Sequence, residues 1–145
     1  GPIRAKSREL DAQAGLNVPL LVKIAPDMSE EEVALVAGSI ARNELDGVIA
    51  TNTTVSRDAV SDDPQAQEAG GLSGKPVFEA SNTVIRLLRA HLPTLPIIGV
   101  GGIDSGEAAK AKIAAGADLV QLYSGLIYQG PALVQQCAKA LKQGE

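Results

Sequence analysis

The sequence predicts an α/β fold in which four strand–helix units in tandem form a parallel half-barrel, half of a TIM-type (β/α)8 barrel. Short apolar runs that start near residues 20, 46, 96 and 119 alternate with segments of helical periodicity. Strands in such tandem units pair in parallel through right-handed crossovers. A complete barrel takes about 250 residues, whereas this chain has 145. The length therefore predicts half a barrel.

The first unit begins with a helix over residues 3–14, which carry mixed charges and end at Gly15. The first strand is predicted over residues 19–24, because this apolar run is rich in β-branched residues and lies between two prolines. Lys23 interrupts its apolar character close to the carboxyl end.

A capping-box pattern predicts where the second helix begins. Ser29 and Glu32 have the spacing of this motif, and apolar residues at helical intervals follow as far as Asn43. The second strand is predicted over residues 46–50, and four small polar residues, 51–54, follow at its carboxyl end.

Residues 55–75 are too polar and too numerous for an ordinary connection between a strand and a helix. They include a glycine-rich run, residues 70–74, and we interpret the whole segment as a functional loop or lid. Helical periodicity returns over residues 79–91.

The last two units follow the same order. Pro96 precedes the third strand, and Asp104 and Glu107 form a second capping pattern that opens a helix ending at Gly116. After the fourth strand, Gly130-Pro131 opens a last helix.

Composition narrows the possible functions. The chain is 45% apolar and 21% charged with a net charge of −4 and no basic run, so we expect small-molecule or protein partners and no nucleic acid. The single Cys137 and the lone His91 provide neither a disulfide framework nor a metal cluster, which fits a reducing compartment. No apolar run reaches the roughly 18 residues of a membrane span. We expect residues 1–145 to form a single soluble segment.

Two strand ends indicate an anion site. The runs 97–103 and 119–125 are apolar strands, and the first breaks into Gly101-Gly102. Glycines allow backbone N–H groups to approach an anion without a Cβ in the way. In (β/α)8 barrels the phosphate site is built from the loops after the last two strands. The pattern therefore predicts a flavin or sugar-phosphate site.

Each of these features also has a purely structural interpretation. Lys23 could be a snorkelling surface residue, and Asn52 with its threonines could be a turn cluster. Gly101-Gly102 could be a plain strand-to-helix turn, residues 70–74 a flexible loop, and Tyr123 a packing residue at the rim. The residues alone leave these alternatives open.

Five motifs taken in order give the chain a more specific resemblance. From Pro19 onward it closely resembles the dihydroorotate dehydrogenase family. The Ala-Pro-Asp after the lysine resembles class 2, the quinone-reducing, membrane-associated form. The motifs are Val22-Lys23-Ile24-Ala25-Pro26-Asp27, Thr51-Asn52-Thr53-Thr54, Gly70-Gly71-Leu72-Ser73-Gly74-Lys75-Pro76, Ile97-Ile98-Gly99-Val100-Gly101-Gly102 and Gln121-Leu122-Tyr123-Ser124.

The resemblance implies an FMN-dependent (β/α)8 barrel that oxidises dihydroorotate to orotate in pyrimidine biosynthesis. Lys23 matches the lysine beside the flavin ring, where a cation would stabilise negative charge that develops on reduction. Thr51 matches a flavin contact. Asn52 and Thr53 match residues that hydrogen-bond the substrate, and an amide suits a uracil-like edge because it both donates and accepts.

The remaining matches belong to the cofactor. Ser73 and Gly74 correspond to the loop that approaches the flavin. Where many relatives carry Thr, this chain has Ser124, which keeps the hydroxyl donor. The residues that match the phosphate site are Gly101, Gly102, Tyr123 and Ser124.

Other family features have no match in this sequence. In class 2 enzymes the catalytic base is a serine on the first half of the barrel, and N-terminal helices meet the membrane and the quinone. Ser56 and Ser81 are not candidates for that base. The resemblance thus implies the carboxyl-terminal half of a class 2 enzyme, without its catalytic base. The parent would be peripheral on the cytoplasmic side of a bacterial inner membrane, or on the inner mitochondrial membrane in a eukaryote.

Three functions follow as hypotheses. The first is the FMN-binding half of a dihydroorotate:quinone oxidoreductase, inactive by itself. The second is a phosphate- or FMN-binding module without chemistry. The third is assembly, because a half-barrel leaves open edges near Leu21 and Val120 that the missing half of the barrel or a second copy of the chain would cover.

Overall fold

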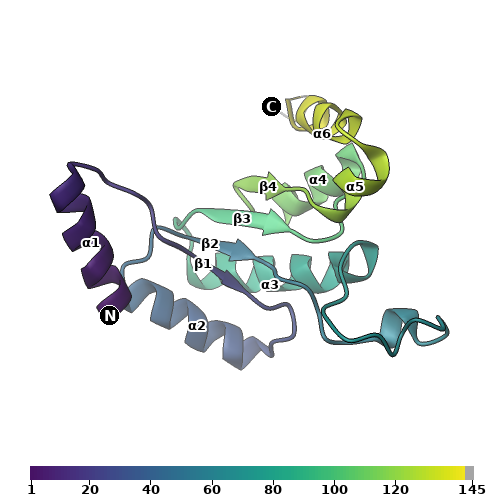
Figure 1. Ribbon diagram of the computed structural model, residues 1–145, viewed down its shortest axis with the longest axis horizontal. Coiled ribbons are helices and arrows are strands. Elements are labelled where there is room, and N and C mark those ends of the chain that lie inside the picture. Colours follow the sequence, from purple (N-terminus) through teal and green to yellow (C-terminus); the bar gives the residue numbers. More distant parts are fainter. Residues whose placement is uncertain (143–145) are drawn as a thin grey trace.

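A computed structural model describes residues 1–142 of the chain and shows a four-stranded sheet with helices between the strands (Figure 1). All neighbouring strands are parallel and follow the chain order β1-β2-β3-β4. This topology confirms the predicted half-barrel and places β1 and β4 at the two open edges. The strands are β1 (Leu21–Ile24), β2 (Gly47–Ala50), β3 (Ile97–Val100) and β4 (Leu119–Gln121).

The helices follow the predicted order, with one addition. A short helix, α5, lies between β4 and the last helix and was not predicted. Most of its residues are exposed, so the sequence shows no periodic apolar pattern there. The helices are α1 (Pro2–Ala14), α2 (Glu30–Arg42), α3 (Phe78–His91), α4 (Gly106–Ala114), α5 (Ser124–Gln129) and α6 (Ala132–Lys142), with 3-10 turns at η1 (Asp58–Val60) and η2 (Lys75–Val77).

One predicted helix cap is confirmed and the other is wrong. The Ser29 amide donates to Glu32 at 2.8 Å and the Glu32 amide donates to the Ser29 hydroxyl at 3.2 Å, which completes the capping box of α2. In α4 the cap is Ser105, whose hydroxyl accepts from the Ala108 amide at 3.1 Å. Asp104 lies one residue too early, and its carboxylate instead pairs with Lys75.

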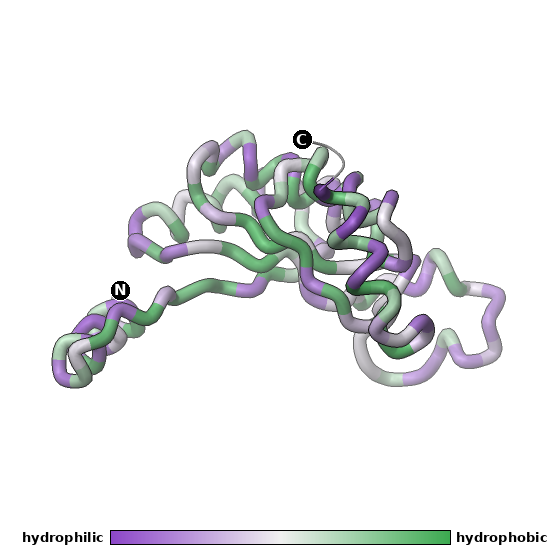
Figure 2. Tube along the Cα trace, turned by 90° about the horizontal axis from the view of Figure 1, so that it is seen from above, coloured by the Kyte–Doolittle hydropathy of each residue, from purple (hydrophilic) through white to green (hydrophobic). Residues whose placement is uncertain are grey.

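The main core lies between one face of the sheet and helices α2 and α3 (Figure 1). Alternate strand residues point into it, because successive side chains of a strand face opposite sides. Val48 and Ile97 are fully buried there against residues such as Val33 and Ile85. Figure 2 shows the same pattern as apolar segments gathered along the strands.

A second, smaller core joins α4 to α6. Leu133 and Cys137 of α6 are buried with Ile103 and Ala109. Burial raises the pKa of the Cys137 thiol, and the nearby Glu107 carboxylate acts in the same direction. The Cys137 side chain is therefore part of this second core.

The opposite face of the sheet has no helix over it in the described part of the chain. The strand register places Lys23, Ile49, Ile98 and Leu119 in one row across this face. The row is less buried than the core face, and Leu119 at the β4 edge is 61% exposed. Apolar side chains thus remain open to solvent on this face.

The long loop after β2 projects from the sheet and is organised by a single arginine (Figure 1). Thr54 and Leu72 close its base with reciprocal backbone hydrogen bonds of 3.0 and 2.8 Å. Arg57 fills the loop and donates to backbone carbonyls of Thr54, Val55, Ser56, Ala66, Glu68 and Gly70.

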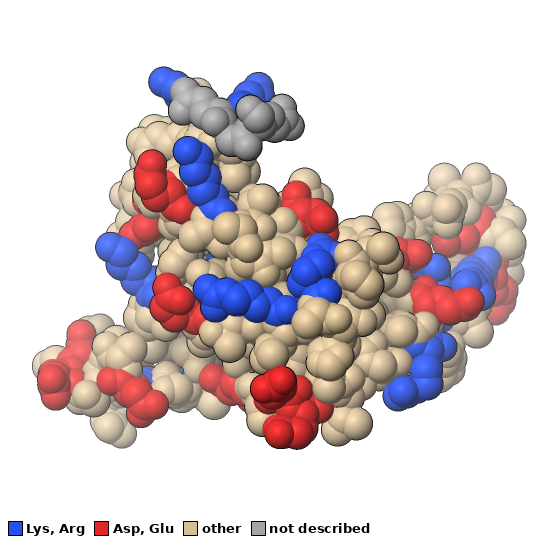
Figure 3. Space-filling view, turned by 180° about the vertical axis from the view of Figure 1, so that it is seen from behind, with Lys and Arg blue, Asp and Glu red and all other residues tan. Residues whose placement is uncertain are grey.

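Basic and acidic side chains are interspersed over the face shown in Figure 3, and neither sign forms one continuous patch. Within residues 1–142, no helix is both long and apolar enough to cross a membrane.

Two aspartates clamp neighbouring strands at their amino ends. The Asp46 carboxylate accepts from the Leu20 amide at 2.6 Å and from Arg4 of α1 at 2.7 and 2.8 Å. Asp118 repeats the device, accepting from the Ile97 amide at 2.8 Å and from Arg89 at 2.6 Å. Each aspartate therefore holds the start of one strand beside the next.

We predict that Asp46→Asn lowers stability at neutral pH and flattens its dependence on acid. The Leu20 amide and the Arg4 guanidinium hold the pKa of the Asp46 carboxyl below its usual value of 3.8. Its contribution is therefore complete above that value and is lost as pH falls through the lower, folded-state pKa. Urea unfolding at pH 7 and at pH 3 measures both effects. Asp62→Asn, at an exposed position, is the control, and equal acid sensitivity in both variants would contradict the prediction.

Candidate functional site

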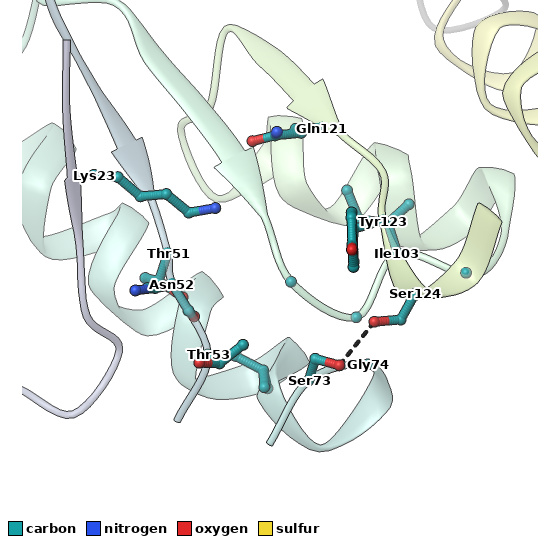
Figure 4. A pocket seen from close by; sticks show the side chains of 14 residues that line it. Lys23, Thr51, Asn52, Thr53, Ser73, Gly74, Ile103, Gln121, Tyr123 and Ser124 are labelled. Carbon is teal, nitrogen blue, oxygen red and sulfur yellow. Dashed lines mark hydrogen bonds between the residues drawn. The ribbon is translucent and has the colours of Figure 1, made fainter. Parts of the chain in front are cut away.

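One cavity opens at the carboxyl ends of the strands and is lined by residues that lie in or directly after each of the four strands (Figure 4). Its lining includes every site residue that the sequence predicts, drawn from positions 101 residues apart in the chain, Lys23 to Ser124. The predicted residues in the lining are Lys23, Thr51, Asn52, Thr53, Ser73, Gly74, Gly101, Gly102, Tyr123 and Ser124.

The two edge strands provide long polar side chains. Lys23 from β1 and Gln121 from β4 reach over the sheet from opposite sides of the cavity (Figure 4). Gln121 was not singled out by the sequence, although it lies in the motif that contains Tyr123. Strand alternation was the available signal, because it places Gln121 on the same face as Leu119 and Lys23. Ile103 is a second lining residue that the sequence reasoning missed.

The end of β2 is fixed by both of its neighbours. The Thr51 amide donates to the Val100 carbonyl at 2.9 Å, and the Asn52 amide donates to the Ile24 carbonyl at 2.7 Å. Thr51 is buried, whereas the Asn52 and Thr53 side chains are exposed at the cavity.

An aspartate holds the next turn of this segment. The Asp27 carboxylate accepts from the Thr54 hydroxyl and from the Val55 amide, the latter at 3.0 Å. The polar run after β2 is thus positioned by backbone and carboxylate contacts, which leaves the Asn52 amide group available to a ligand.

Gly101 and Gly102 form a turn that only glycine fits. Their φ angles are 119° and 70°, in the region that L side chains rarely adopt. A Cβ on Gly102 would lie 2.6 Å from Cβ of Phe78, and one on Gly101 would lie 3.0 Å from Oγ of Ser81. The turn therefore packs directly on the first turn of α3 while its other side lines the cavity.

Two hydroxyls from separate segments line the cavity together with the glycine turn: Ser73 lies in the loop before η2, and Ser124 is the first residue of α5. The Ser124 hydroxyl donates to that of Ser73 at 2.9 Å (Figure 4). Gly74 lies beside them and has a positive φ of 78°. Tyr123 is 71% exposed at the rim, so its ring is available to a ligand.

The lining favours an anion. It contains the Lys23 ammonium, hydroxyls and glycine backbone, and no carboxylate among the described residues. Glycine backbone and hydroxyl donors suit a phosphate, and the lysine adds charge beside a larger ring system. Within residues 1–142, no group of three or more His, Cys, Asp or Glu side chains is placed to hold a metal ion.

The fold and this cavity define a class of protein: a parallel α/β half-barrel with an anion-accepting site at the carboxyl ends of its strands. The sequence model described as dihydroorotate dehydrogenase matches residues 4–144. This chain belongs to the dihydroorotate dehydrogenase family, as the resemblance indicated.

Curated relatives support this family assignment. A protein of Burkholderia mallei strain SAVP1 named "Dihydroorotate dehydrogenase (quinone)" is 60% identical over 144 residues, which cover 99% of this chain and 42% of that protein. A Burkholderia pseudomallei strain K96243 protein of the same name is 59% identical over 98% of this chain and 42% of its own length. This chain thus spans less than half the length of these relatives.

Structural similarity extends over most of the chain. The structure of DHODH from Eimeria tenella in complex with ferulenol has a TM-score of 0.82 and 35% identity, over 87% of this chain and 34% of that chain. The ligand-free form gives 0.79 and 34%, over 86% and 35% of the two chains.

We predict that Gly102→Ala destabilises the protein more than Gly130→Ala. Both glycines have nearly the same positive φ, 70° and 69°, so an alanine is strained at either position, by about 1–3 kcal/mol. Only Gly102 has Phe78 within 4 Å of an added Cβ, which adds about 1–3 kcal/mol of overpacking. Urea unfolding compares the two. Equal losses would show that the close approach to α3 is not a constraint.

Proposed function

We propose that this chain forms the cofactor- and substrate-binding part of a quinone-reducing dihydroorotate dehydrogenase, which oxidises dihydroorotate to orotate in pyrimidine biosynthesis. One observation carries the proposal: all the site residues that the resemblance assigns to cofactor or substrate line one cavity, although these residues come from separate segments. The names of the curated relatives support the quinone-dependent class.

The cavity fits FMN by the chemistry of its donors. We assign the phosphate end to the Gly101–Gly102 turn and the Ser73 and Ser124 hydroxyls, because these groups lie together and leave backbone accessible. The ring system would extend toward Thr51 and Lys23 along the same cavity. When bound, FMN supplies the chemistry of accepting a hydride from substrate C6.

Lys23 would act on the flavin, and Asn52 would act on the substrate. The Lys23 ammonium stabilises negative charge at the flavin edge and does not serve as a base. Asn52 and Thr53 hydrogen-bond the substrate ring and its carboxylate, since both side chains stand exposed in the cavity without a partner that would compete.

The proton from substrate C5 requires a base that these residues do not provide. Ser56 and Ser81 are outside the cavity lining, and Ser81 is buried against Lys112. We place the base on a segment of the protein beyond this sequence, consistent with relatives more than twice as long.

The open sheet face supports the same view. Leu119 is exposed, Ile49 and Ile98 of the same row are half-buried, and β1 and β4 are unpaired edges within the described residues. Sheet edges in native proteins are normally covered. We propose that further strand–helix units of the same barrel cover this face, and that the whole protein associates peripherally with a membrane where it meets quinone.

Visible absorbance and intact mass of the full-length protein, under native and denaturing conditions, test the proposal. We expect flavin absorbance in the native sample, release of FMN on denaturation, and reduction of the flavin by dihydroorotate. Native mass distinguishes a single long chain from paired copies of a 14.9 kDa chain. A folded full-length protein that retains no flavin absorbance after incubation with FMN and removal of unbound FMN would exclude the proposed function.

We predict that Lys23→Ala slows flavin reduction by dihydroorotate at least about tenfold while weakening FMN binding less, because the cation acts mainly on charge that develops during reduction. Stopped-flow half-reactions give the rate, and fluorescence titration gives the affinity. Lys139→Ala, at an exposed position on α6, is the control. A rate equal to that of the unaltered protein would remove Lys23 from this role.

A further inference from the structure

A lysine is completely buried behind the glycine turn. Lys112 of α4 has no exposed surface, and its ammonium reaches the first turn of α3. It donates to the Ser81 hydroxyl, to Asn82 Oδ1 at 2.8 Å and to the Phe78 carbonyl at 3.4 Å. The ammonium also lies 4.7 Å from the centre of the Phe78 ring, within range of a cation–π contact.

All the partners of this ammonium are neutral. None of the ion pairs among the described residues includes Lys112, and Glu79 is the carboxylate whose field reaches it. The ammonium also sits at the amino end of α3, where the helix dipole is positive. A buried cation costs free energy unless an opposite charge offsets it. The protein alone supplies little of that charge.

An anion bound in the cavity could supply this counter-charge, because only the backbone of the glycine turn and the first turn of α3 separate the cavity from Lys112. Ser81, which accepts from Lys112, lies against Gly101, and Phe78 lies against Gly102. The far side of those two glycines lines the cavity. The contacts therefore run in sequence: Lys112 touches the first turn of α3, that turn touches the glycine turn, and the glycine turn lines the cavity.

The geometry points to Lys112 as a buried positioning residue for the anionic end of the cofactor: its charge and its bonds to α3 hold the Gly101–Gly102 turn for a phosphate group. This inference rests on the proposed function and names a residue that the family motifs did not single out. Lys112 does not touch the cofactor, and it acts through Ser81 and Phe78.

Two physical effects follow from this placement. The ammonium fixes the α3 turn on which the glycines pack, so the backbone donors are preorganised before an anion arrives. Its charge also acts through protein of low effective dielectric, where Coulomb interactions are stronger than in water. Burial lowers the pKa of Lys112 to about 8. The Glu79 carboxylate opposes this shift, and the positive charge of Arg86 adds to it. A bound phosphate would favour the charged form of Lys112.

The test compares FMN with riboflavin, which lacks the phosphate, in the full-length protein. Lys112→Met removes charge and hydrogen bonds but keeps a long unbranched side chain, and Lys112→Gln keeps a polar donor. Lys110→Gln, an exposed lysine of the same helix, makes the same change in net charge. Circular dichroism and thermal unfolding show which variants are folded. Dissociation constants are measured for both ligands by flavin fluorescence.

We expect both Lys112 variants to bind FMN about tenfold more weakly than the unaltered protein does. Their affinity for riboflavin should change by less than about twofold. The Lys110 control should leave both affinities unchanged. Equal losses for the two ligands would reduce Lys112 to a packing residue and overturn the inference. Unchanged FMN affinity in a folded Lys112 variant would overturn it as well.

A second measurement separates this inference from the proposed function. Inorganic phosphate should raise the thermal unfolding temperature of the unaltered protein, and that shift should shrink in Lys112→Gln. A Ser81→Ala variant, which keeps the cation and removes its contact with the turn, should give a partial loss. If phosphate protects the unaltered protein more than Lys112→Gln but FMN does not bind, the proposed function fails while the role of Lys112 at a phosphate site survives. If neither ligand binds the unaltered protein, both fail.

Discussion

The close approach of the Gly101–Gly102 turn to α3 is the constraint on which the candidate site depends. Both residues have positive φ, and an added Cβ would lie 3.0 Å from Ser81 Oγ at Gly101 and 2.6 Å from Phe78 Cβ at Gly102, so this packing holds the backbone of the turn. One side is the buried layer of Phe78, Ser81 and Lys112, and the other lines the cavity. The shape of the binding surface is therefore set by packing inside the protein and not by the ligand.

Parallel pairing explains how distant segments meet at this turn. When all strands run in the same direction, their carboxyl ends lie along one edge of the sheet, and the loops that follow them converge. The amino ends are held by the repeated clamps of Asp46 and Asp118, which tie β1 to β2 and β3 to β4. With register fixed at one end, the opposite ends deliver Lys23 and Ser124 to the same cavity.

The sequence predicted those features that depend on local pattern. Strand positions followed from short apolar runs. The site residues were assigned by the resemblance to the family, since the local pattern alone left structural alternatives open, and they line one cavity. Prediction from the sequence failed where the outcome depends on a tertiary contact. Ser105 rather than Asp104 caps α4 because of the extended backbone at that residue, and α5 has no buried face to create a periodicity. Lys112 is a further case, because lysine is rarely fully buried and only the packing of α4 on α3 shows where its ammonium lies.

Within the described residues, one end of the cavity is held by buried contacts and the other end is formed by side chains of the two edge strands. The glycine turn and Thr51 are anchored by buried partners, whereas Lys23 and Gln121 project from the two edge strands. The phosphate end that we assign can therefore form from internal contacts alone. The ring end requires that both edges be held at a fixed separation, and a sheet with open edges does not fix it. This asymmetry fits our proposal that further strand–helix units are needed to place the ring end and the reacting groups.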